Sequence, residues 1–184
     1  MSLPRLLALL GLTSAQAGGA GGGVGPRETE TVRRIAARLE GLQPERARRL
    51  AAFAYVLARV AHADLEIDAS ESAEMERIVA AHGGLDAAEA ALAVEIAKSS
   101  ARLFGGTGNY VVTREFRDLA SPAERLELLE CAYAVAAANG SISALESAEC
   151  ARIAEELGMS HAEDLAVRSA FRDKLSLFQG PKPR

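Results

Sequence analysis

The sequence predicts an all-α fold, a duplicated helical-hairpin bundle of about seven to eight helices with pseudo-two-fold symmetry. First, the 184 residues are 49% hydrophobic but only 4% aromatic, and the chain has no Trp. Such a composition favours closely packed helices over a sheet. Second, helix-capping signals recur along the chain. Third, one helical segment is written twice. The length suits a single medium domain preceded by an arm.

Residues 1–27 are expected to form an N-terminal arm and a Gly-rich linker. The stretch Met1–Ala17 has a short Leu-rich run and an Ala-x-Ala end, as signal peptides do. The run from Leu6 to Leu12 is short and contains Gly11, so we interpret it as an amphipathic arm of a cytoplasmic protein. Export with cleavage after Ala17 is the alternative. No segment approaches the roughly 20 apolar residues that span a bilayer.

Residues 28–178 are expected to form one helical domain, followed by a tail at 179–184. Pro44 and Pro122 mark helix starts, and Gly83 with Gly84 marks a helix end. The segment 105–109 lacks the Gly-Lys-Ser/Thr of a phosphate loop, so it is predicted to be a turn between halves. The expected helices are 28–40, 44–63, 69–81, 86–105, 113–119, 122–138, 143–157 and a last one capped by Ser160.

The internal repeat is the most specific feature of the sequence. With a shift of 75 residues, 60–83 matches 135–158 at 12 positions, including the polar block Glu-Ser-Ala-Glu at 71–74 and 146–149. Each copy consists of a helix, an acidic turn and a second helix. Because neither hairpin buries its apolar face alone, we expect the two copies to pack face to face.

Four polar side chains lie at the ends of apolar helical stripes. Asp64 continues the stripe of the first hairpin helix, and Asn139 continues the corresponding stripe in the second copy. Glu71 and Glu146 are in line with Met75 and Cys150 on the helices that follow. We therefore expect all four to face inward and to meet between the halves: Asp64, Glu71, Asn139 and Glu146. Four other acidic side chains of the two copies are expected to be solvated: Glu66, Glu76, Glu155 and Glu156.

Two interpretations of these four residues stay open. Inward carboxylates repel one another, and a hard cation such as Ca²⁺ or Mg²⁺ would neutralise them through oxygen ligands. Alternatively, Asp68-x-x-Glu71 and Ser143-x-x-Glu146 are capping boxes, and the acidic residues only satisfy helix N-termini. An EF-hand is excluded, because Ala69 stands at its turn glycine and Met75 at its bidentate glutamate.

Charge and motifs exclude several other functions. A formal charge of −4 argues against a general nucleic-acid binder. The three histidines lack zinc spacing, and Cys131 and Cys150 are expected to be packed thiols. No nucleophile motif is present, so an enzyme is not expected. A basic run is predicted to form solvated faces with ion pairs, or alternatively a docking face for an acidic partner: Arg27, Arg33, Arg34, Arg38, Arg46, Arg48 and Arg49.

The doubled motif, "VAHADLEIDASESAEMERI" and "VAAANGSISALESAECARI", resembles the duplicated acidic turn of the TerB-like family over about residues 30–178. That family includes tellurite-resistance TerB proteins and the N-terminal domain of membrane-anchored DnaJ-type co-chaperones. The resemblance implies an acidic divalent-metal site and a non-enzymatic role with a protein partner, or a second copy, in a stress-related complex near the inner membrane. The family's ligands fall on Asp64, Glu71, Asn139 and Glu146. Leu65 replaces the motif glycine that the second copy keeps at Gly140.

Overall fold

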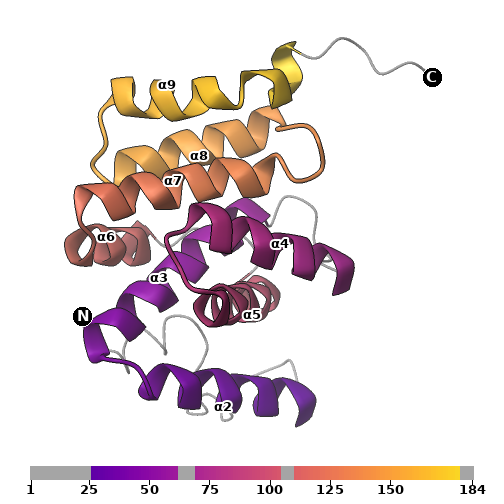
Figure 1. Ribbon diagram of the computed structural model, residues 1–184, viewed down its shortest axis with the longest axis vertical. Helices are drawn as coiled ribbons and strands as arrows, with labels where there is room; N and C mark the ends of the chain where they lie inside the picture. Colours follow the sequence, from indigo (N-terminus) through magenta and orange to yellow (C-terminus); the bar gives the residue numbers. More distant parts are fainter. Residues whose placement is uncertain (1–25, 62–68, 105–109, 179–184) are drawn as a thin grey trace.

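The fold is entirely helical in the part of the chain that the structure describes. The computed structural model describes residues 26–61, 69–104 and 110–178, which form eight α-helices and two short 3₁₀ turns (Figure 1). The α-helices are α2 (Pro26–Glu40), α3 (Pro44–Ala61), α4 (Ala69–His82), α5 (Ala87–Phe104), α6 (Tyr110–Leu119), α7 (Pro122–Ala136), α8 (Ala144–Glu156) and α9 (His161–Ala170). The turns η3 (Arg172–Lys174) and η4 (Ser176–Phe178) follow. The predicted all-α class is confirmed.

The helix bounds follow the expected punctuation, with three differences of two or three residues. Helix α2 begins at Pro26 instead of residue 28, α6 begins at Tyr110 instead of residue 113, and α7 ends at Ala136 because residues 137–140 form a turn. The predicted arm and linker (apart from Pro26 and Arg27, which begin α2), the segment 105–109 and the tail lie outside the described residues. None of the described helices is both long enough and apolar enough to cross a membrane.

Local capping chemistry accounts for four helix starts. In four capping boxes, the first residue's side chain accepts from the backbone N–H three residues on, and the glutamate accepts from the first residue's N–H. These reciprocal bonds satisfy N–H groups that have no partner within the helix. The four boxes are Asp86 with Glu89, Ser121 with Glu124, Ser143 with Glu146, and Ser160 with Glu163. Asp68, the first residue of the box predicted with Glu71, lies outside the described residues.

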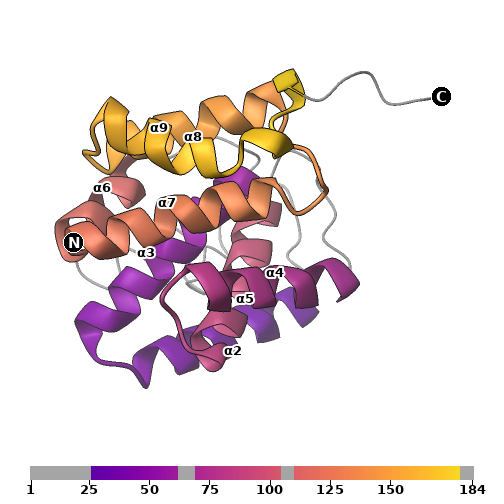
Figure 2. The same ribbon diagram turned by 45° about the horizontal axis from the view of Figure 1, so that its top comes forward.

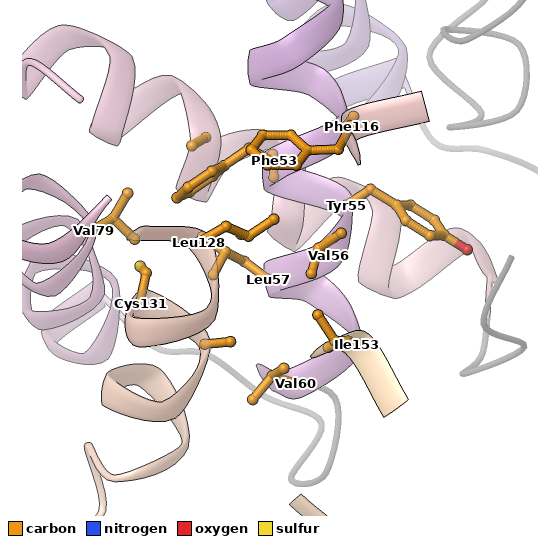
Figure 3. Close-up of a cluster of buried hydrophobic side chains, with 14 of the residues drawn as sticks. Phe53, Tyr55, Val56, Leu57, Val60, Val79, Phe116, Leu128, Cys131 and Ile153 are labelled. Carbon is orange, nitrogen blue, oxygen red and sulfur yellow. The ribbon is translucent and has the colours of Figure 1, made fainter. Parts of the chain in front are cut away.

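Helix α3 is the centre of the core. Almost every residue from Leu50 to Val60 is buried, and α3 packs against α5, α6, α7 and α8. Figure 3 shows its Phe53 and Leu57 among buried side chains from neighbouring helices. The Phe53 ring lies 6.0 Å, centroid to centroid, from Phe116 of α6. A helix buried on all sides requires apolar residues around its whole circumference, and the run Leu50–Ala58 supplies them.

The two halves pack against each other, but they are not built alike. Helix α4 contacts α7, and α3 contacts α8, which are the two contacts that face-to-face hairpins require. In the second half α9 covers α7 and α8, whereas in the first half the longer α5 packs against α2, α3 and α4 (Figure 2). Pseudo-two-fold symmetry therefore stays a prediction.

The basic run near the N-terminus forms ion pairs between helices. Arg34 and Arg38 pair with Glu95 of α5, and Arg46 pairs with Glu89. Two more arginines of α3 reach α6 and α7, Arg48 to Glu115 at 2.5 Å and Arg49 to Glu124 at 2.6 Å. The predicted ion-paired faces are confirmed for these five arginines. Exposed pairs of this kind each contribute only about 0–1 kcal/mol.

Candidate functional site

Three of the four helices that flank the two acidic turns have their turn-side ends on one side of the molecule. Helix α7 ends there, and α4 and α8 begin there, on the right of Figures 1 and 2. Helix α3 ends beside the second half of α8, since Arg59 near its end pairs with Glu149 and Glu156. The start of α4, which follows residues 62–68, is thus on the same side as the turn 137–143.

The second turn is held in place by the C-terminal segment. Ile142 is buried, its N–H donates to the Lys174 carbonyl at 2.7 Å, and its carbonyl accepts from the Ser176 N–H at 2.9 Å. Gly140 has a φ of +84°, a left-handed conformation that explains the glycine of the motif. Asn139, just before it, is exposed. The expectation that Asn139 faces inward is therefore wrong, because the helix ends three residues earlier.

Glu146 has the geometry of a helix cap. Its Oε2 accepts from the Ser143 N–H at 2.7 Å, and its own N–H donates to the Ser143 hydroxyl at 3.2 Å. The side chain is half-buried in this position. The carboxylate of Glu146 is thus placed as the capping interpretation expects, with its Oε2 bound to the Ser143 N–H.

The first copy contributes no described ligand. Asp64 lies outside the described residues, and Glu71 lies in α4 but its side chain is not among those described. Within the described ranges, no group of three or more His, Cys, Asp or Glu side chains is arranged to hold a metal ion. A cation bound by Asp64, Glu71, Asn139 and Glu146 therefore stays a prediction.

The helices α4 and α8 share their inward and outward faces, as the repeat predicts. Met75 and Cys150 occupy equivalent positions, and both are buried. The equivalent pairs Arg77 with Glu74 and Arg152 with Glu149 also recur, at 2.5 and 2.7 Å, although Glu149 is half-buried where Glu74 is exposed. The repeat in the sequence is therefore a repeat in orientation for these two helices.

A buried arginine connects the halves, and the sequence analysis did not anticipate it. Arg59, near the end of α3, is only 6% exposed and lies against α6 and α8. Its guanidinium donates to Glu149 at 2.8 Å, to Glu156 at 2.5 Å and to the Thr113 hydroxyl at 2.7 Å. The available signal was a lone cation in the apolar run 51–61.

The charges around Arg59 balance. Arg152 also donates to Glu149, so two arginines face two carboxylates. Burial acts to lower the pKa of Arg59, but the bonds and charges of Glu156 and Glu149 outweigh it and raise that pKa. Glu156, expected to be solvated, is half-buried because it neutralises Arg59. The cluster has the composition of a structural ion-pair network.

A second buried polar contact joins α7 to α9. The Tyr133 hydroxyl donates to the Asp164 carboxylate at 3.0 Å, and both residues are buried. The Tyr133 ring stacks on Phe171, with centroids 5.7 Å apart. Burial, followed by the nearby Cys150 and Asp164, raises the pKa of Tyr133, so its hydroxyl remains a donor at neutral and moderately alkaline pH.

Both cysteines are free, buried thiols, as expected. Burial raises the pKa of Cys131 to about 12 and shifts the pKa of Cys150 in the same direction. Since only the thiolate is a good nucleophile, we predict that both react slowly with a maleimide in the native protein and quickly in urea. Mass spectrometry of labelled samples measures this, and rapid labelling of the native protein would contradict the burial.

The raised pKa of Cys131 also predicts a loss of stability at alkaline pH. The thiol titrates near pH 8.5 in the unfolded chain. The stability that comes from keeping it neutral in the folded protein is therefore intact below that pH and is lost as the pH rises toward 12. Cys131→Ala lacks one titrating thiol, and its free energy of unfolding should fall less steeply than that of the wild type between about pH 9 and 11.

A family model for "Tellurite resistance protein TerB" matches residues 50–169. The chain belongs to the TerB family. The match covers both acidic turns and runs from α3 into α9, so α2 precedes the matched residues. The resemblance inferred from the doubled turn is confirmed, over a shorter range than expected. Comparisons with curated proteins and with solved structures gave no match.

Proposed function

We propose that this chain is a non-enzymatic helical binding module that acts in the cytoplasm within a stress-related, tellurite-resistance-like complex. The observation that carries the proposal is the TerB-family match over residues 50–169. In this proposal the two acidic turns bind a divalent cation, Ca²⁺ or Mg²⁺, and the occupied module presents a helical surface to a protein partner.

Two features support the cation. Six carboxylates lie between Asp64 and Glu76, and Arg77 is the first basic residue after them. Helix α4 begins on the same side of the molecule as the turn 137–143, and in this proposal Asp64 and Glu71 of the first copy share an ion with Asn139 and Glu146 of the second. An exposed Asn139 offers an amide oxygen to an ion at the surface, and Glu146 would have to share its carboxylate with Ser143.

The partner surface is proposed to lie beside the second turn. Leu145, in the first turn of α8, is 80% exposed, and Leu177 is 79% exposed. The bridge between Ile142 and Leu175 brings the C-terminal segment that carries Leu177 to this turn. Exposed leucines next to the turn that is proposed to bind the cation could pack against a protein partner, or against a second copy of the chain.

Thermal unfolding in the presence of Ca²⁺, Mg²⁺ or Mn²⁺ tests the cation. At 100 times the dissociation constant, a specific ion adds about 2.7 kcal/mol to the free energy of unfolding. Asp64→Asn should weaken this effect. Glu155→Gln is the matched control, because it removes one charge from an exposed position on α8 and should leave the ion response unchanged.

The second candidate is a purely structural or interaction domain whose acidic residues are helix caps. The bonds between Ser143 and Glu146 favour it. Under this alternative no ion raises the melting temperature, and Glu71→Gln costs little stability. A flat response to all three ions would therefore remove the cation from the proposal and leave the binding module.

A further inference from the structure

A polar cleft lies between α2, α4 and α5, away from the second acidic turn. Its volume is about 360 Å³, and it opens to solvent. Helix α5 packs against both α2 and α4 (Figures 1 and 2), so one wall comes from a helix that precedes the family-matched residues. The side chains that matter for its chemistry are Thr31, Arg34, Arg38, Ser72, Glu95 and Lys98.

Lys98 supplies a positive charge inside this cleft. It is half-buried on α5, and its ammonium donates to the Ser72 hydroxyl of α4 at 2.5 Å. Among the described residues no carboxylate lies within ion-pair distance of Lys98, unlike the arginines around it. A half-buried ammonium whose neighbour is a hydroxyl group is a donor for an anionic ligand.

The two arginines of α2 are fixed next to Lys98. Glu95 accepts from Arg34 Nε at 3.1 Å and from Arg38 Nη1 at 3.5 Å, and Arg38 Nη2 donates to the Ala88 carbonyl at 3.2 Å. A guanidinium has five N–H donors, so these bonds orient the two groups and leave donors available. A carboxylate that orients arginines in this way reduces the entropy lost when a ligand binds.

The lining of the cleft carries a positive formal charge, although the whole chain carries a negative one. Three cations, Arg34, Arg38 and Lys98, face the carboxylates of Glu76 and Glu95, which gives a formal charge of +1 in a chain of charge −4. Thr31, Ser72 and Ser99 add hydroxyl groups to the lining. Cations on two helices, with hydroxyl groups in the same lining, offer hydrogen-bond donors to the oxygens of a phosphate group.

We propose that this cleft binds a small molecule that carries a phosphate group, with Lys98 and Arg34 as its main charged contacts. A volume of about 360 Å³ is in the range of small-ligand sites. The site goes beyond the cation and partner proposed above, since its ligand is an anion and its α2 wall lies outside the family-matched residues.

Isothermal titration calorimetry with inorganic phosphate and with pyrophosphate, at constant ionic strength and without divalent ions, tests the site. The full chain should bind pyrophosphate, and Lys98→Gln should raise the dissociation constant about tenfold, as expected for one lost charge-assisted bond. Arg34→Gln should also weaken binding. Circular dichroism and melting temperatures verify that both variants fold.

Lys174→Gln is the matched control, because it makes the same chemical change at an exposed lysine in η3, away from the cleft. Its affinity should stay within about twofold of the wild type. Absence of binding in the wild type would overturn the site. Equal weakening by Lys98→Gln and Lys174→Gln would overturn it too, because it would show a response to net charge alone.

Discussion

Arg59→Met is expected to lower the free energy of unfolding by about 3–5 kcal/mol, although methionine fills a similar volume. The substitution leaves Glu149 and Glu156 half-buried without the cation that pairs with both of them, and it removes the donor to the buried Thr113 hydroxyl. Breaking a buried pair costs far more than the pair contributes, because the remaining charge has lost its hydration. Urea denaturation followed by circular dichroism measures the loss.

Arg77→Met is the matched control for Arg59. It removes the same group from α4, where the pair with Glu74 is exposed on both sides, so a loss below about 1 kcal/mol is expected. Arg59→Met combined with Glu149→Gln and Glu156→Gln should recover part of the stability, since no uncompensated charge remains. If Arg59→Met and Arg77→Met cost the same, the cluster does not hold the halves together.

Local chemistry explains why the helices were predictable. A capping box involves residues three apart, and a proline or a left-handed glycine acts on its own backbone. The starts at Pro44 and Pro122 and the end near Gly84, whose φ is +61°, follow from such signals. The class and the order of the helices could therefore be derived from short stretches of sequence.

The candidate site was less predictable because its placement depends on where a helix stops. The stripe that ends at Asn139 assumes helical periodicity, but α7 ends at Ala136 and the next residues turn. Beyond a helix end, the period no longer determines which way a side chain points. The prediction that Glu156 is solvated was wrong for another reason. Its partner Arg59 is 97 residues away, and no local pattern indicates the pairing.

The repeat also hides an asymmetry that has consequences for the site. With the 75-residue shift, Arg59 corresponds to Ala134, and Glu156 corresponds to Ala81. The ionic cluster therefore exists once, between the end of α3 and α8, and has no counterpart between α7 and α4. This ionic contact holds α3, the helix that leads into the first acidic turn. That turn carries Asp64 at the position where the second copy has Asn139.

Tyr133→Ala should also cost about 3–5 kcal/mol, and its effect should be greatest in α9. Tyr133 is fully buried on α7, stacks on Phe171 and donates to the Asp164 carboxylate of α9. Removing it creates a cavity and leaves a buried carboxylate without this donor. Hydrogen exchange followed by mass spectrometry should show the amides of α9 exchanging faster, while those of α3 change little.

Two variants separate the packing of Tyr133 from its hydrogen bond. Tyr133→Phe keeps the ring and should cost about 1–3 kcal/mol, the penalty for an unsatisfied buried acceptor. Tyr110→Ala makes the same truncation at an exposed tyrosine, whose ring makes a cation–π contact with Arg114. This control should cost less than about 1 kcal/mol. Since η3 and η4 continue from α9 and hold Ile142, loosening α9 should also release the second acidic turn. Unchanged exchange at residues 140–146 in Tyr133→Ala would show that the turn is held independently of α9.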